Sequence, residues 1–123
     1  MNKKITLAFR LLLGLILLVM GSNKFFHFLP LLSMEGPPAD FMGALIATGY
    51  MFPLIAITEI SAGALLLINK WIGLALIFAS IMSVNIILFH LTLNPEGIAL
   101  GAVVAISTVV LIYANWKKFK TLF

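Results

Sequence analysis

The segment GALIATGYMFPLIAITEISAGALLLI, residues 43–68, decides the fold of this chain, because it is long and apolar and contains one formal charge, Glu59. An acidic residue at the centre of a membrane-spanning helix costs roughly 2.5 to 3.5 kcal/mol even on the most lenient insertion scale. Helical spacing places Glu59 on one face with Ala62 and Gly63, and small residues let two helices pack closely. We therefore expect Glu59 to face protein and not lipid.

The composition of the whole chain indicates the class of protein. Of its 123 residues, 63% are hydrophobic and 10% are charged, and the mean hydropathy is +1.18. This composition excludes an ordinary soluble surface and predicts an integral membrane protein. A membrane span needs about 20 apolar residues, so the length leaves no room for a separate soluble domain. The absence of cysteine excludes disulfides, thiolate metal sites and thiol redox chemistry.

We predict one all-α domain over residues 1–123, an integral membrane four-helix bundle with helices at about 5–28, 41–68, 71–93 and 98–116. An even number of spans puts both termini on one side of the membrane. Most cations share that side and Lys24 lies on the other; the shared set is Lys3, Lys4, Arg10, Lys70, Lys117, Lys118 and Lys120. This bias predicts cytoplasmic termini in a multi-pass protein of the plasma or inner membrane. Because the cations lie at helix ends, the net charge of +4 does not indicate a nucleic-acid partner.

The first predicted helix carries a stripe of two cations and two glycines. Arg10, Gly14, Gly21 and Lys24 follow each other at steps of four, seven and three residues, which keeps them on one face. The glycines are expected to let another helix approach closely. The simplest interpretation of Arg10 and Lys24, about 21 Å apart along the helix, is that their side chains snorkel to opposite membrane interfaces.

The second predicted helix, 41–68, is too long for a straight crossing, since its apolar part alone extends about 39 Å. Pro53 cannot donate a hydrogen bond to the carbonyl of Gly49, so we expect a kink at this point. Asp40 is expected to cap the start of the helix, and Pro37-Pro38 to end any helix in the connection before it.

Two polar residues of the third predicted helix, Asn85 and His90, are candidates for a site. They are five residues apart, about 140° around the helix, so they would flank a crevice from two sides. With the termini inside, Glu59 lies near mid-membrane and His90 near the outer surface. No metal site is predicted, because His27 and His90 are separated by the long connection, and no second carboxylate stands at helical spacing from Glu59.

Five motifs resemble those of the DoxX-like membrane proteins. They are Arg10-x3-Gly14, Gly21-x-x-Lys24-Phe-Phe-x-Phe, Phe41-Met-Gly-Ala-Leu-Ile-Ala-Thr-Gly49-Tyr50-x-x-Pro53, Glu59-x3-Gly63-x-Leu-Leu-Leu and Asn85-x4-His90-Leu-x-Leu-Asn-Pro95. The resemblance implies a small four-helix fold over the whole chain and marks Arg10, Lys24, Glu59, Asn85 and His90. The family takes its name from a small subunit of a thiosulfate:quinone oxidoreductase, and other members are described with membrane oxidoreductase complexes. The resemblance implies the fold of this chain more strongly than it implies a reaction.

The first hypothesis for function is a subunit of a membrane oxidoreductase system. In it, a crevice open to the outer leaflet, with Lys24 and His90 at its mouth and Glu59 lower down, binds a quinone or another lipid-soluble carbonyl compound. No covalently bound cofactor is expected, no catalytic residue is assigned, and a partner subunit would carry the redox centre.

Two further hypotheses stay open. One is a small proton-coupled transporter that uses Glu59, although the strong charge bias argues against the dual-topology dimers of small exporters. The other is a non-enzymatic membrane scaffold, either homo-oligomeric or part of a larger complex, in which Glu59 holds helices together.

Overall fold

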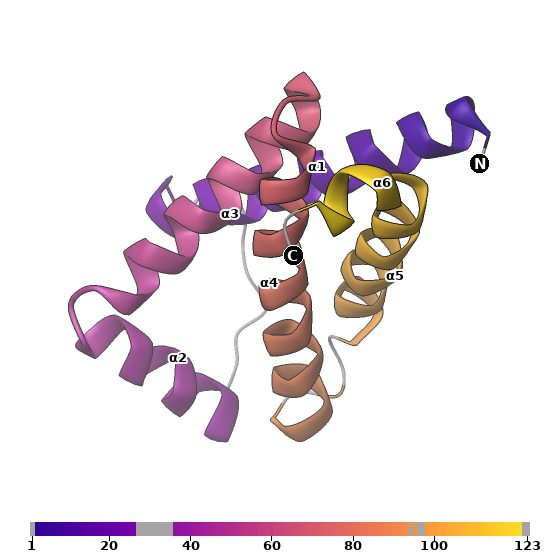
Figure 1. Ribbon diagram of the computed structural model, residues 1–123. Helices are drawn as coiled ribbons and strands as arrows, with labels where there is room; N and C mark the ends of the chain where they lie inside the picture. The colour runs from indigo at the N-terminus through magenta and orange to yellow at the C-terminus, as the bar shows by residue number, and fades with distance from the viewer. Residues whose placement is uncertain (1, 27–35, 94, 96–97, 122–123) are drawn as a thin grey trace.

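The computed structural model describes residues 2–26, 36–93, 95 and 98–121, and all regular structure in these ranges is helical. The elements are α1 (Lys3–Phe26), α2 (Pro37–Ala47), α3 (Met51–Ile68), α4 (Ile72–Thr92), α5 (Ile98–Ala114) and α6 (Trp116–Lys120). Figure 1 shows α4 between α3 and α5, with α1 behind them and α2 apart from the other helices. The all-α prediction is therefore confirmed for the described residues. The predicted end of the first helix at residue 28 lies outside them.

Three of the described helices, α1, α3 and α4, are long and apolar enough to cross a membrane. The apolar α5 is shorter, at 17 residues, which gives a length of about 26 Å. It ends at Ala114, before the predicted boundary of 116, and the short α6 follows after Asn115. Between α3 and α4, Asn69 and Trp71 adopt positive φ values of 58° and 48°, and this tight turn reverses the chain between the predicted helix boundaries of 68 and 71.

The prediction of a single helix over residues 41–68 with a kink at Pro53 is wrong. The chain breaks earlier, between α2 and α3, at Gly49, whose φ of 82° lies in the region that glycine adopts readily. The hydroxyl of Thr48 accepts a hydrogen bond from the N–H of Met51 at 3.0 Å and so supports the start of α3. Pro53 is the third residue of α3, where a backbone N–H has no intrahelical acceptor in any case, so proline is tolerated without a kink.

The predicted role of Asp40 as helix cap is also wrong, because α2 begins earlier, with Gly36 as its N-cap residue and the two prolines at its first positions. Proline suits this place because its φ is already helical and its missing N–H would be unpaired there. The connection in which Pro37-Pro38 were expected to end any helix, residues 27–35, lies outside the described residues. Asp40 lies inside the first turn of α2, where its negative charge is favoured by the positive end of the helix dipole.

α1 and α3 pack antiparallel with their glycines in contact. A Cβ atom on Gly63 would lie 2.6 Å from the carbonyl oxygen of Gly14, and one on Gly21 would lie 2.8 Å from the carbonyl oxygen of Ala56. Only glycine permits this approach, so the two helix backbones touch at both places. The glycine stripe predicted on the first helix is confirmed as the face that packs on α3.

α4 and α5 form a second antiparallel pair. Gly101 of α5 lies against Ile86, and the hydroxyls of Ser83 and Thr108 lie 3.1 Å apart in the buried interface between the two helices. Fully buried leucines from α1, α3, α4 and α5 join the two pairs into one core, and these are Leu13, Leu17, Leu66, Leu76 and Leu111.

Candidate functional site

Lys24 and Glu59 form a buried ion pair between α1 and α3. Lys24 Nζ lies 2.7 Å from Glu59 Oε1, and the two side chains are 14% and 3% exposed. The ring of Phe52 forms a cation–π contact with the same ammonium group, with its centroid 5.9 Å from Nζ. Gly21 makes room for the pair, since a Cβ there would lie 3.0 Å from the Cβ of Glu59.

The structure confirms that Glu59 faces protein, but it corrects the expectation for Lys24. The lysine does not snorkel to an interface, and it does not lie apart from Glu59 at the mouth of a crevice. Its ammonium group pairs with Glu59 Oε1, while Glu59 Oε2 is buried with no hydrogen-bond partner among the described residues. The physical reason is that a carboxylate in a small-residue interface attracts the one cation whose side chain reaches it.

Arg10, at the other end of the α1 stripe, binds the C-terminal end of α3. Its Nη1 donates hydrogen bonds to the carbonyl oxygens of Leu66 and Leu67, the latter at 3.2 Å. These carbonyls belong to the last turn of α3, where a positive charge is favoured by the helix dipole. The Leu66 oxygen also accepts a hydrogen bond from the N–H of Asn69 at 3.3 Å. α1 thus holds α3 by two cations, one at its end and one at its middle.

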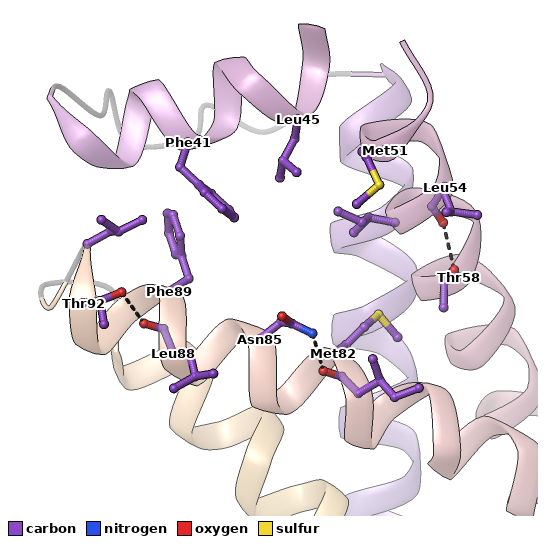
Figure 2. Close-up of a pocket in the computed structure, with 13 residues that line it drawn as sticks. Phe41, Leu45, Met51, Leu54, Thr58, Met82, Asn85, Leu88, Phe89 and Thr92 are labelled. Carbon is purple, nitrogen blue, oxygen red and sulfur yellow. Dashed lines mark hydrogen bonds between the residues drawn. The ribbon is translucent and has the colours of Figure 1, made fainter. Parts of the chain in front are cut away.

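A cavity of about 510 Å³ lies between α2, α3 and α4. We call it the α2–α4 pocket, and Figure 2 shows it between α2 and α4, with α3 closing one side. Its lining is almost wholly apolar and consists of Phe41, Leu45, Met51, Leu54, Ile55, Thr58, Ile81, Met82, Asn85, Leu88, Phe89, Thr92 and Leu93. The rings of Phe41 and Phe89 join α2 to α4 with centroids 5.4 Å apart.

Asn85 contributes the one side-chain amide of the described pocket lining, and Figure 2 shows it on α4 facing the cavity. Its Nδ2 donates one hydrogen bond to the carbonyl oxygen of Ile81 at 3.0 Å. An amide has two N–H donors and an oxygen acceptor, so further hydrogen-bonding capacity remains for a bound molecule.

His90 lies on another side of α4. Its Nδ1 pairs with the carbonyl oxygen of Ile86 at 2.8 Å, and a Cβ on Gly101 of α5 would lie 3.4 Å from the same nitrogen. The described residues that line the α2–α4 pocket include Asn85 but not His90, Lys24 or Glu59. This pocket therefore does not join the four residues expected to share a crevice, because the spacing of about 140° turns Asn85 toward α2 and His90 toward α5.

The family profile of DoxX matches residues 5–91, more than two thirds of the chain. The chain belongs to the DoxX family. No curated protein and no solved structure matches it. The match covers α1 to α4 nearly completely and ends before α5. The contacts between α1 and α3 lie inside the DoxX region, and so does most of the α2–α4 pocket, with Thr92 and Leu93 of its lining beyond it. With its apolar helices, this DoxX protein is a membrane protein.

Some polar residues that the structure buries in this DoxX protein were given no role by sequence reasoning. Asn23 is 3% exposed on α1, and Ser107 and Thr108 of α5 are 1% and 2% exposed. Asn23 precedes Lys24 in the sequence and does not belong to the stripe of glycines and cations. Only its polarity, within an apolar helix, could have indicated a buried position. The pocket residues Phe41 and Phe89 gave no signal, because aromatic residues are common in apolar helices and their contact joins two separate elements.

Proposed function

We propose that this DoxX protein binds a quinone or another lipid-soluble carbonyl compound in the α2–α4 pocket and serves a membrane oxidoreductase system. The observation that carries the proposal is the pocket itself. Its volume of about 510 Å³ falls within the range of ligand sites, roughly 300 to 1,000 Å³. Such sites combine apolar walls with a few polar groups that orient the ligand, and Asn85 is a group of that kind.

The chemistry of Asn85 suits both redox forms of such a ligand. Its second N–H can donate to a quinone carbonyl, and its Oδ1 can accept from a quinol hydroxyl. In this proposal Asn85, and not Lys24 or His90, binds the carbonyl oxygen of the ligand. The proposal gives this chain ligand binding only, and a partner subunit carries the redox centre.

A non-enzymatic scaffold is the second candidate, and the Lys24–Glu59 pair favours it. The pair joins α1 to α3 and neither residue belongs to the described pocket lining, as expected of groups that hold helices together. A homo-oligomer or a larger complex is the assembly such a scaffold would support. The proton-coupled transporter has less support, since Glu59 is paired and does not line the pocket.

For the topology, we propose four crossings, with α5 as the fourth, and both termini in the cytoplasm of a plasma or inner membrane. Most of the cations lie at the N-terminal end of α1, in the α3–α4 turn and in α6. The positive-inside rule places these three regions on the cytoplasmic side. Reporter fusions at both termini test this, and a C-terminus on the outer side would overturn it.

Lipid extracts of the purified full chain test the function, with two variants of α3. Leu54 lines the pocket and is 53% exposed, whereas Ile57 is 54% exposed and is not part of the described lining. We expect quinone to co-purify with the unmodified chain and with Ile57→Trp, and to be lost in Leu54→Trp, whose indole fills the pocket. Absence of quinone from the unmodified chain, or its retention in both variants, contradicts the proposal. Partner proteins identified in the same preparation test the link to an oxidoreductase.

A further inference from the structure

We infer that the α2–α4 pocket selects an uncharged ligand, one polar group of which binds Asn85. The inference rests on the proposed function and narrows the class of ligand that this site accepts. It predicts that ketones and alcohols with an apolar body are bound through Asn85, and that carboxylates and ammonium compounds are not.

The first argument concerns charge. Figure 2 draws 13 residues that line the pocket, and none of these described residues is ionisable. Lys24 and Glu59 are paired with each other at 2.7 Å. A charged group placed against apolar walls loses its hydration without gaining a counter-charge, which is among the most unfavourable transfers in proteins. The pocket therefore disfavours a charged group at the depth of Asn85.

The second argument concerns hydrogen bonds. The other polar side chains of the lining, Thr58 and Thr92, donate their hydroxyl hydrogens to backbone carbonyls of their own helices, at 2.8 and 2.6 Å. Figure 2 shows both bonds, from Thr58 to Leu54 and from Thr92 to Leu88. Asn85 alone of the described lining residues keeps a free N–H to donate. The described lining thus offers one free side-chain N–H donor, and a ligand such as a quinone places one of its carbonyl groups there.

The third argument concerns depth. Asn85 lies seven residues before the end of α4 at Thr92, which corresponds to about 10 Å along the helix. A charged head group must stay near the membrane surface, and from there it does not reach Asn85 without losing water. Charged amphiphiles can insert only their apolar chains, and such binding does not depend on the amide.

Nanodiscs that hold the full chain are titrated with 2-undecanone, undecane or undecanoate, and the bound compound is measured by native mass spectrometry. The variant Asn85→Leu removes the amide. Ser80→Ala is the matched control, since Ser80 is another polar residue of α4, bonded to its own helix and not part of the described lining. We expect the unmodified chain and Ser80→Ala to bind 2-undecanone about fivefold more tightly than undecane, the ratio that one hydrogen bond contributes.

In Asn85→Leu the ratio should fall to about one, with undecane binding retained, and undecanoate binding should be the same with and without Asn85. The inference is overturned if Asn85→Leu leaves the ratio unchanged, or if undecanoate binds as tightly as 2-undecanone and weakens in Asn85→Leu. In either case, loss of undecane binding in Leu54→Trp would show that the pocket still binds ligands and that only the assigned selectivity is wrong. If no compound binds the unmodified chain, the proposed function fails with the inference.

Discussion

Lys24 Nζ lies 2.7 Å from Glu59 Oε1, and this ion pair joins the C-terminal end of α1 to the middle of α3. Glu59 is 2% exposed, so neither water nor lipid replaces the lysine as its partner. Removing one member of a buried ion pair leaves the other charge without compensation, whereas replacing both by apolar residues is often neutral or stabilising. The pair therefore predicts a specific pattern of stabilities.

We expect Glu59→Leu and Lys24→Met each to lower the free energy of unfolding by about 3 kcal/mol, the lower end of the range for broken buried pairs. The double variant should be more stable than either single variant, because it contains no unpaired charge. Unfolding of the purified chain by increasing denaturing detergent measures all three. Additive losses in the double variant would show that the two charges do not stabilise each other.

Gly63 provides a test of the contact between α1 and α3. A Cβ at this position would lie 2.6 Å from the carbonyl oxygen of Gly14 and from the backbone nitrogen of Leu18, so Gly63→Ala forces the helices apart. We expect a loss of about 1 to 3 kcal/mol, as for other overpacked sites. Gly43, within α2, has no atom within 4 Å of the same position. Gly43→Ala gains the same helix propensity without a clash, so equal effects of the two substitutions would contradict this account of the α1–α3 contact.

The α1–α3 contact was largely predictable from the sequence, and the reason is local. Gly14, Gly21 and the two cations recur at helical spacing, and so do Glu59 and Gly63, so each stripe could be recognised within one helix. What the sequence did not show was the register between the stripes. That register places Lys24 against Glu59 and Arg10 against the end of α3, and it depends on the way two helices pack.

Replacing Arg10 is expected to affect stability and amide exchange at the C-terminal end of α3. Its hydrogen bonds to the carbonyls of Leu66 and Leu67 satisfy acceptors of the last turn. Arg10→Met should therefore lower stability by about 1 kcal/mol and accelerate amide hydrogen exchange in that turn. Lys4→Met removes an exposed cation from the same helix and should change neither. Unchanged exchange in Arg10→Met would show that other groups satisfy these carbonyls.

The α2–α4 pocket was not predictable in the same way. Its walls come from three elements, and the break at Gly49 that separates α2 from α3 was placed by sequence reasoning at Pro53 instead. Proline at the start of a helix and proline in its interior look alike in a continuous apolar segment. Asn85 was recognised as a candidate from its polarity, and the angle of about 140° between it and His90 followed from their spacing. The spacing did not show that different helices, α2 and α5, lie on these two sides of α4.

The contact between Phe41 and Phe89 predicts how a ligand reaches the pocket. These rings join α2 to α4, and Pro38 is the only buried residue of α2, so α2 packs less closely against the other described helices than they pack against one another. The chain has no cysteine, which makes an introduced pair the only possible disulfide. Oxidised Phe41→Cys/Phe89→Cys should take up 2-undecanone more slowly than its reduced form, because α2 can no longer separate from α4. Ser83→Cys/Thr108→Cys is the control, since it links α4 to α5 outside the described pocket lining. Equal uptake by the oxidised and reduced forms of the first pair would show that the ligand does not enter between α2 and α4.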